Sequence, residues 1–200
     1  MSLLKINNLS CQRGYNLLFS GVSLKLNSGD ILRINGTNGS GKTSFLKILA
    51  GIVAQEQGDI FFDDHAVKSA DYQREIFYLG HLLNLSLELT CIENLEFLTA
   101  LNQSNQQYSL PDALEKMGMS GYENEVCAKL SAGQKRRTAL AGLILSKATI
   151  WLLDEPFTAL DPQGVTMVEA QIKKHCDNGG ICLLTTHQDC KLAGQKTLAL

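Results

Sequence analysis

The sequence predicts an α/β fold in which buried, mostly parallel strands alternate with helices, and three observations support this prediction. Residues 31–34 form an apolar run that is followed by a Gly-rich stretch and then by a helix at 44–50. Residues 150–153 form a second apolar run, which ends in two carboxylates and precedes a long helix that begins at Asp161. A third apolar run, at 181–184, completes a set of strands of the kind that is buried on both faces of a sheet.

The Gly-rich stretch after the first strand is predicted to be a phosphate-binding loop. GTNGSGKT fits G-x-x-x-x-G-K-[ST], with the strand before it and the helix after it that this pattern requires. Its glycines let successive backbone N–H groups turn inward around phosphate oxygens at the positive end of the following helix. Lys42 is expected to reach the β- and γ-phosphates, and Thr43 to ligate Mg²⁺. The predicted nucleotide-binding residues of the loop are Gly36, Thr37, Asn38, Gly39, Ser40, Gly41, Lys42, Thr43 and Ser44.

The two carboxylates, Asp154 and Glu155, close the second apolar run. They therefore lie at the carboxyl end of a buried strand, which is the edge where ligands bind in open α/β sheets. Asp154 is suited to hold Mg²⁺ through its water shell, and Glu155 to orient and deprotonate an attacking water. Acidic residues at a strand end are ordinarily a solvated turn, so this assignment depends on the phosphate loop.

The string LSAGQ, at 130–134, opens another helix. Ser131 and Gln134 form the S-x-x-Q pattern of a capping box, and a helical run follows at 135–145. Such a helix start exposes unpaired N–H groups, which favour a docked anion. Taken alone, the string is better explained as a well-capped helix. Without it, kinases, GTPases and ATPases all remain open.

At LSAGQ the chain resembles the ATP-binding subunits of ABC transporters, whose LSGGQ signature is matched with Ala132 in place of the first glycine. The resemblance covers nearly the whole chain. It implies a P-loop NTPase fold of ABC type, with an N-terminal antiparallel β part and a helical subdomain, and it implies hydrolysis of ATP. It also implies a head-to-tail homodimer, in which Ser131, Gly133 and Gln134 of one copy approach the ATP held by the P-loop of the other.

Two further site elements follow from the resemblance. The D-loop of the family is matched by residues 159–161, so Asp161 is expected near the nucleotide. The switch histidine is matched by His187, which would bridge the γ-phosphate and Glu155. The expected catalytic residues are therefore Lys42, Glu155 and His187.

The chain departs from the family pattern at two places. Leu82 stands where family members have a glutamine, and an aliphatic side chain can neither ligate a metal nor orient water. His81, beside it, is the residue that would substitute in part. At the position of the aromatic residue that commonly stacks on adenine the chain has Arg13, with Tyr15 two residues on, and either side chain can lie against a base.

The remaining elements predict a single domain of 200 residues. Strands are expected at 3–9, 17–26 and 58–62, and helices at 90–101 and 111–117, joined by a polar link at 102–109. The first of these helices begins with a Thr90–Glu93 capping box. We expect a RecA-like core at about 1–80 and 130–200 and a helical subdomain at about 81–129.

Composition limits the classes of partner and the environment that we expect for this protein. A formal charge of −2 provides no broad basic surface, so nucleic acid is not an expected partner. Six cysteines without a C-x-x-C pair are expected to be reduced and mostly packed. The apolar stretch at 138–153 contains Lys147 and divides into a helix and a strand, so it is not expected to cross a bilayer. A transport role would then require separate membrane subunits.

Within the family, the chain is most similar to the ATP-binding subunit of the bacterial cytochrome c maturation system, the haem exporter ATPase. The resemblance rests on YLGH, LSAGQKRR, WLLDEPFTALD and GGICLLTTHQ. It implies a peripheral protein on the cytoplasmic face of the inner membrane, with integral membrane permease subunits as partners. The alternatives are the ATPase of another ABC exporter, a soluble ABC-type ATPase, or a nucleotide-binding module with weak hydrolysis, the last suggested by Leu82.

Overall fold

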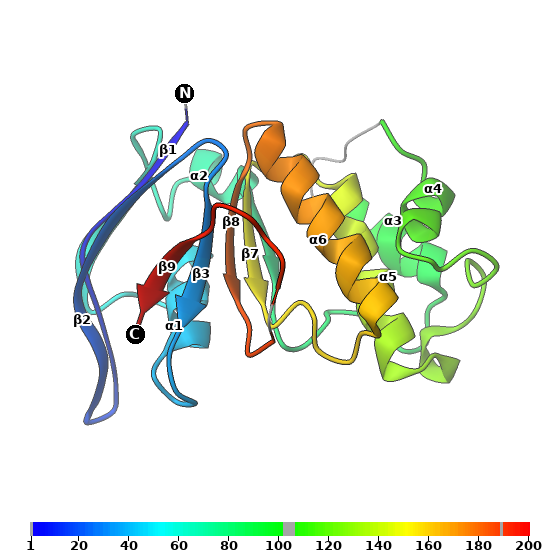
Figure 1. The fold of residues 1–200 in the computed structure, drawn as a ribbon, viewed down its shortest axis with the longest axis horizontal. Helices are drawn as coiled ribbons and strands as arrows, with labels where there is room; N and C mark the ends of the chain where they lie inside the picture. The colour runs from blue at the N-terminus through cyan, green and yellow to red at the C-terminus, as the bar shows by residue number, and fades with distance from the viewer. Residues whose placement is uncertain (1, 102–106, 189) are drawn as a thin grey trace.

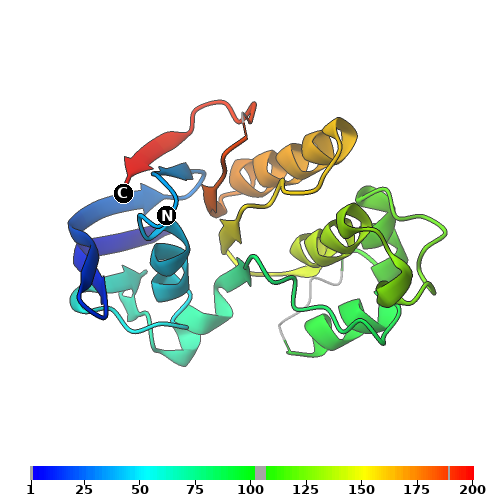
Figure 2. The ribbon, with the colours of Figure 1, turned by 90° about the horizontal axis from the view of Figure 1, so that it is seen from below.

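In a computed structural model that describes residues 2–101, 107–188 and 190–200, two β-sheets and a group of helices lie in successive layers (Figure 1). A strongly bent antiparallel sheet forms one side of the molecule, a parallel sheet lies in the middle, and most of the helices lie beyond it. The same layers are visible at right angles in Figure 2. This arrangement confirms the predicted α/β class, with an antiparallel part at the N-terminus.

The middle sheet is parallel at every strand pair among the described residues. Its strands, in the spatial order β6-β7-β8-β3-β9, are Ile76–Leu79, Ile150–Asp154, Ile181–Thr185, Ile31–Asn35 and Lys196–Ala199. Every residue of β7 and β8 is buried, because the antiparallel sheet with its helices covers one face and the helical layer covers the other. The three predicted apolar strands are thus confirmed.

The outer sheet is antiparallel, in the order β2-β1-β4-β5. Its strands are Leu3–Arg13 (β1), Asn16–Asn27 (β2), Gln57–Phe62 (β4) and His65–Ala66 (β5). The strands predicted at 3–9, 17–26 and 58–62 are confirmed, and β1 and β2 are longer than expected. The β1–β2 pairing contains register irregularities between Ile6 and Gln12, which increase the local twist and help the ribbon to curve over the core.

The helices lie on both faces of the parallel sheet. They are α1 Lys42–Leu49, α2 Ala70–Arg74, α3 Cys91–Leu101, α4 Leu110–Lys116, the 3₁₀ turn η1 Cys127–Lys129, α5 Ala132–Leu145 and α6 Pro162–Asp177. Both α1 and α2 lie between the two sheets, whereas α3 to α6 cover the opposite face (Figures 1 and 2). No helix within the described residues has both the length and the apolar character that a membrane span needs.

Predicted helix starts are present where the sequence places them. Thr90 and Glu93 exchange the two hydrogen bonds of a capping box, at 2.8 and 3.2 Å, and so do Ser131 and Gln134, at 2.9 and 3.2 Å. Asp161 caps α6 by accepting a hydrogen bond from the backbone N–H of Gly164 at 2.8 Å. These local contacts need no tertiary partner, which explains why the sequence predicts them well.

Two hydrophobic cores lie on the two faces of the parallel sheet. One fills the space between the sheets around α1 and includes the fully buried Phe45 and Tyr72. The other lies under α3 to α6 and includes Phe157. Helix α5 packs against both α3 and α4, so the predicted boundary between core and helical subdomain near residue 130 stays a prediction. Of the polar link predicted at 102–109, residues 102–106 lie outside the described residues.

A stacked pair of rings joins α6 to the start of β7. The imidazole of His175 lies parallel to the indole of Trp151, with ring centroids 3.8 Å apart, and its Nε2 is 3.0 Å from the carbonyl oxygen of Thr149. Burial lowers the pKa of His175 to about 4, although backbone hydrogen bonds partly favour the protonated ring. The folded protein therefore keeps this histidine neutral under conditions in which an unfolded chain protonates it.

This histidine should make the fold acid-sensitive. Because the pKa is depressed in the folded state, the unfolded chain binds the extra proton between about pH 4 and 6.5, and stability falls as pH falls through this window. The free energy of unfolding should decrease by up to about 3 kcal/mol more in wild type than in His175→Phe, which keeps the stacked ring. Denaturant titrations across this pH range measure the difference. Replacing the exposed His65 by Gln is the control, and equal pH slopes in wild type and His175→Phe would contradict the prediction.

Candidate functional site

The loop between β3 and α1 is closely packed on its own Ser40 side chain and on β2. Gly41 precedes α1 with φ 104°, and a Cβ added there would lie 3.0 Å from atoms of Leu18 and Phe19. A Cβ at Gly36 would lie only 2.4 Å from the Ser40 hydroxyl oxygen. Glycine is therefore required at both positions.

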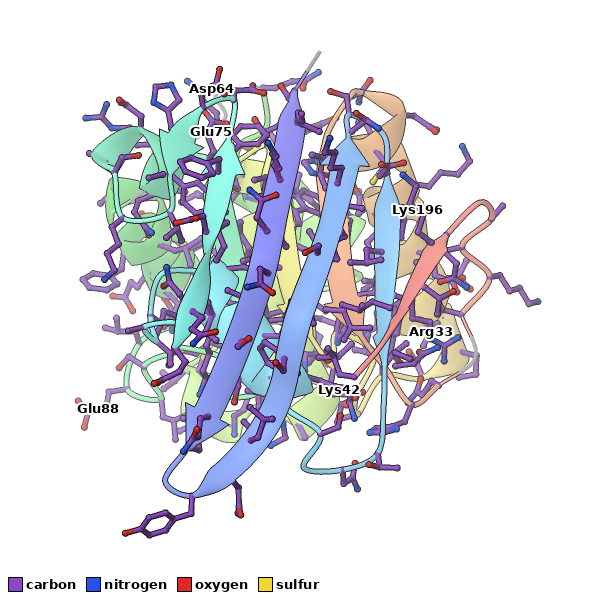
Figure 3. All side chains as sticks on the ribbon, turned by 90° about the vertical axis from the view of Figure 1, so that its left-hand side faces the viewer. Arg33, Lys42, Asp64, Glu75, Glu88 and Lys196 are labelled. Atoms are coloured by element: carbon purple, nitrogen blue, oxygen red, sulfur yellow. The ribbon has the colours of Figure 1, made fainter. Side chains whose placement is uncertain are left out.

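Lys42 is the first residue of α1, and its side chain turns back over the loop. Its Nζ donates hydrogen bonds to the carbonyl oxygens of Gly36 and Thr37, at 2.7 and 3.0 Å. The residue is buried, and Figure 3 shows it below the parallel strands, near their carboxyl ends. A cationic amine is thus held at the centre of the predicted phosphate cradle.

Asp154, the last residue of β7, is held between two hydroxyl groups. Its Oδ2 accepts a hydrogen bond from Thr43 Oγ1 at 2.8 Å, and its Oδ1 accepts one from Thr185 Oγ1 at 2.7 Å. Its exposed fraction is only 3%. A buried carboxylate needs such partners, and here they bring together the start of α1 and the ends of β7 and β8.

Glu155 follows directly and faces His187. The residue has φ 53°, an uncommon backbone conformation for a side chain of this size, and its N–H donates to Thr185 Oγ1 at 3.0 Å. Its Oε1 lies 3.6 Å from His187 Nε2, and its Oε2 accepts a longer hydrogen bond, of 3.4 Å, from the His187 backbone N–H. The carboxylate and the imidazole can therefore act as a pair on a molecule bound at this edge.

A single pocket of about 380 Å³ joins these groups. Leu18 of β2 forms part of its wall, and the predicted site residues that line it are Arg13, Asn38, Gly39, Gly41, Lys42, Thr43, Ser44, Asp154, Glu155 and His187. The structure thus brings most of the predicted site residues together in one pocket, from four separate segments of the chain. Donors from a loop and a helix start lie beside carboxylates, which suits an anionic ligand together with a cation.

The residues of LSAGQ do not line this pocket. Ser131 caps the exposed start of α5, and Gln134 completes its capping box. Gly133 lies against the chain after β7, since an added Cβ would be 2.7 Å from the carbonyl oxygen of Ala159. The start of α5 therefore lies outside the chain's own pocket, with Ser131 exposed.

Asp161 also lies outside the pocket. Its carboxylate caps α6 and forms an ion pair with Arg137 of α5, whose other terminal nitrogen donates to the carbonyl oxygen of Met117 at 3.1 Å. Hydrogen bonds from Gly164 N–H and from Arg137 lower the pKa of Asp161. Within one chain, this residue thus connects α5 with α6.

Three residues near the carboxylates were not identified by sequence reasoning. Thr185 bridges Asp154 and Glu155, and its position at the end of an apolar strand beside β7 was the available clue. Burial raises the pKa of Tyr78, in β6, to about 12, and the nearby Asp154 carboxylate adds to this shift. Arg136 is buried on α5, where desolvation lowers its pKa while Asp154 and Glu155 oppose the shift.

The departure at the glutamine position lies away from the pocket. Leu82 follows β6 in an irregular segment, is 79% exposed and does not line the site, and His81 is exposed as well. Neither side chain hydrogen-bonds to a carboxylate of the site among the described residues.

Comparison with known proteins agrees with this geometry. The family model described as ABC transporter matches residues 19–158, which is more than half of the chain. The chain belongs to the ABC transporter family. The expected fold class and the expected ABC-type ATPase are thereby confirmed.

Two relatives with the same description match most of the chain. The chain is 47% identical over 189 residues to the cytochrome c biogenesis ATP-binding export protein CcmA of Haemophilus influenzae, covering 93% of this chain and 89% of the relative. It is 40% identical to the protein of the same description from Aliivibrio fischeri, covering 94% and 93%. The resemblance to the cytochrome c maturation subunit is therefore confirmed.

Solved structures of ABC proteins share the fold. A putative ABC transporter ATP-binding protein from Pyrococcus furiosus superposes with a TM-score of 0.86 at 22% identity, covering 99% of this chain and 97% of that one. An ATP-binding cassette solved as a dimer in a post-hydrolysis state, bound to ADP and Pi, gives 0.83 at 24% identity, covering 98% and 94%.

Removing the Thr185 hydroxyl should damage both stability and activity. Thr185→Val leaves one oxygen of the buried Asp154 without this partner, so the free energy of unfolding should fall by about 2 kcal/mol. Displacement of Asp154 and Glu155 should lower the rate of ATP hydrolysis about tenfold or more. Denaturant unfolding and phosphate release measure the two effects. Thr185→Ser keeps the hydroxyl and should behave like wild type, and a Val variant that does the same would contradict this reading of the site.

Proposed function

We propose that this chain is the ATP-hydrolysing subunit of a bacterial cytochrome c biogenesis exporter that serves haem delivery. The observation that carries the proposal is the assembly of Asp154, Glu155 and His187 beside the phosphate loop in one pocket. The printed description of the CcmA relatives supports the cytochrome c assignment, because they match most of this chain.

In this proposal the loop residues bind ATP and the carboxylates prepare its hydrolysis. Lys42 carries the charge that meets the β- and γ-phosphates, and the loop N–H groups surround their oxygens. Thr43 Oγ1 and the Asp154 carboxylate, already 2.8 Å apart, are hard oxygen donors that fit Mg²⁺. When bound there, the metal would neutralise charge on the phosphate oxygens. Arg13, at the pocket wall, would lie against the base.

Glu155 is proposed as the group that orients water and accepts its proton. Its carboxylate stands at the open edge of the pocket, and His187 is placed 3.6 Å from it. The imidazole can donate to a γ-phosphate oxygen while remaining in contact with Glu155, which positions the two reacting groups together.

The active form is proposed to be a head-to-tail homodimer. Ser131, Gly133 and Gln134 belong to a helix start that does not line the chain's own pocket, so in this proposal it meets the nucleotide of a second copy. Asp161 would lie at the same interface, presented by its contacts with α6 and Arg137. Integral membrane permease subunits would complete the complex at the cytoplasmic face of the inner membrane, where the chain would be peripheral.

Glu155→Gln should separate ATP binding from hydrolysis. The amide cannot accept the proton of the attacking water, so turnover should fall by at least about a hundredfold while ATP affinity stays within about twofold. Phosphate release and equilibrium nucleotide binding measure these quantities. The same substitution in the native organism should abolish covalent haem in c-type cytochromes.

The matched control is Glu115→Gln, which changes an exposed carboxylate of α4. It should leave binding, hydrolysis and cytochrome maturation unchanged. Full hydrolysis by Glu155→Gln would show that Glu155 is not the base. If Glu155→Gln is inactive in hydrolysis but the organism still makes c-type cytochromes with covalent haem, the exporter assignment is wrong.

Ser131→Glu should act across the dimer. An added carboxylate at the helix start opposes a bound phosphate, so ATP-driven dimerisation of a Glu155→Gln chain should be lost. Binding of ATP to the isolated chain should persist, since Ser131 does not line its pocket. Light scattering and nucleotide titration separate the two. Unimpaired ATP-driven dimers would contradict the proposed arrangement.

A further inference from the structure

Arg33 is a charged residue between apolar neighbours in β3. It belongs to β3, where Ile31, Leu32 and Ile34 are buried, and it lies opposite Leu184 of β8 on one side. On the other side its strand pairs with β9, and Figure 3 shows the side chain beside that strand. A guanidinium in such a position requires partners, because its desolvation is otherwise costly.

The partners of Arg33 are two carbonyl oxygens of the chain that follows β8. One terminal nitrogen donates to the carbonyl oxygen of Gln188 at 3.2 Å and, at a longer 3.5 Å, to that of Thr186. Among the described residues, no carboxylate forms an ion pair with it. The buried Nε of Arg33 has no hydrogen-bond partner among the described residues either. The charge is therefore directed at one segment alone.

The two carbonyls belong to the residues on either side of His187. The histidine ring is 57% exposed, so packing alone does not fix it. Two other contacts hold this segment: Gln188 N–H donates to Thr186 Oγ1 at 3.0 Å, and His187 N–H donates to Glu155 at 3.4 Å. The position of the imidazole therefore depends on the backbone, which Arg33 holds through two carbonyl oxygens and the Glu155 carboxylate through one N–H.

We propose that Arg33 is a positioning residue that holds the His187 backbone so that the imidazole stays against Glu155. This inference rests on the proposed ATPase function and assigns it a residue outside the pocket, since Arg33 is not part of the lining. Its charge-assisted hydrogen bonds to both flanking carbonyls restrict the rotation of the segment. Both bonds come from one terminal nitrogen, so a lysine amine can replace them in part where its shorter side chain allows.

Arg33→Met removes the guanidinium and keeps the length of the side chain. The value of kcat for ATP hydrolysis should fall about tenfold, through misplacement of His187, while KM stays within about twofold, since no nucleotide contact is lost. Arg33→Lys should recover part of kcat. The matched control is Lys196→Met, which removes a cation from the adjacent strand β9, where the amine binds Asp30 at 2.6 Å, away from the His187 segment.

A double-mutant cycle tests whether Arg33 acts through His187. In a His187→Ala background, Arg33→Met should produce no further loss of kcat. An equal loss in both backgrounds, an unchanged kcat in the single variant, or a rise in KM alone would overturn the proposal.

Amide hydrogen exchange separates this proposal from the ATPase proposal. The Gln188 amide, protected by its bond to Thr186, should exchange severalfold faster in Arg33→Met and at the wild-type rate in Lys196→Met. Unchanged exchange in Arg33→Met, or in Arg33→Gln if the Met variant does not fold, overturns the positioning role. Absence of hydrolysis by wild type would instead sink the proposed function and leave the exchange result to decide on Arg33.

Discussion

The carboxylate of Asp154, held between the hydroxyls of Thr43 and Thr185, is the interaction on which the site depends. It joins the start of α1 to the ends of β7 and β8, three segments that are far apart in the sequence. Because the carboxylate is almost fully buried, each oxygen requires a donor, and losing either one is costly. The phosphate loop and the carboxylate edge are thus fixed relative to each other by the protein's own side chains.

The parallel sheet explains why chemistry gathers at this edge. Strands β7 and β8 are apolar along their length and become polar only where they end, at Asp154 and Thr185, which lie directly opposite each other in register. Glu155 and His187 come next on the two neighbouring segments and meet there. A sheet covered on both faces leaves only its ends open to solvent, so polar side chains at those ends converge on a common ligand.

The helical layer is tied to the same edge through α5. Gly133 packs on the Ala159 carbonyl, and Arg137 connects Asp161 with the end of α4 at Met117. A movement of the helix start at Ser131 would therefore be transmitted to the segment between β7 and α6. Close packing and one ion pair thus connect the start of α5 with the segment that follows the carboxylates.

The features that depend on neighbouring residues could be predicted from the amino-acid sequence: the strands, the glycine loop with Lys42 and Thr43, the strand-end carboxylates and the capping boxes at Thr90 and Ser131. Backbone sterics and short-range hydrogen bonds govern these features, so their residue spacing is sufficient to predict them. Three features became known only from the three-dimensional structure: Thr185 hydrogen-bonds to Asp154, Arg33 hydrogen-bonds to the chain beside His187, and Leu82 is exposed to solvent. Those contacts join residues far apart in sequence, and strand order, register and burial, which no local pattern encodes, bring them together.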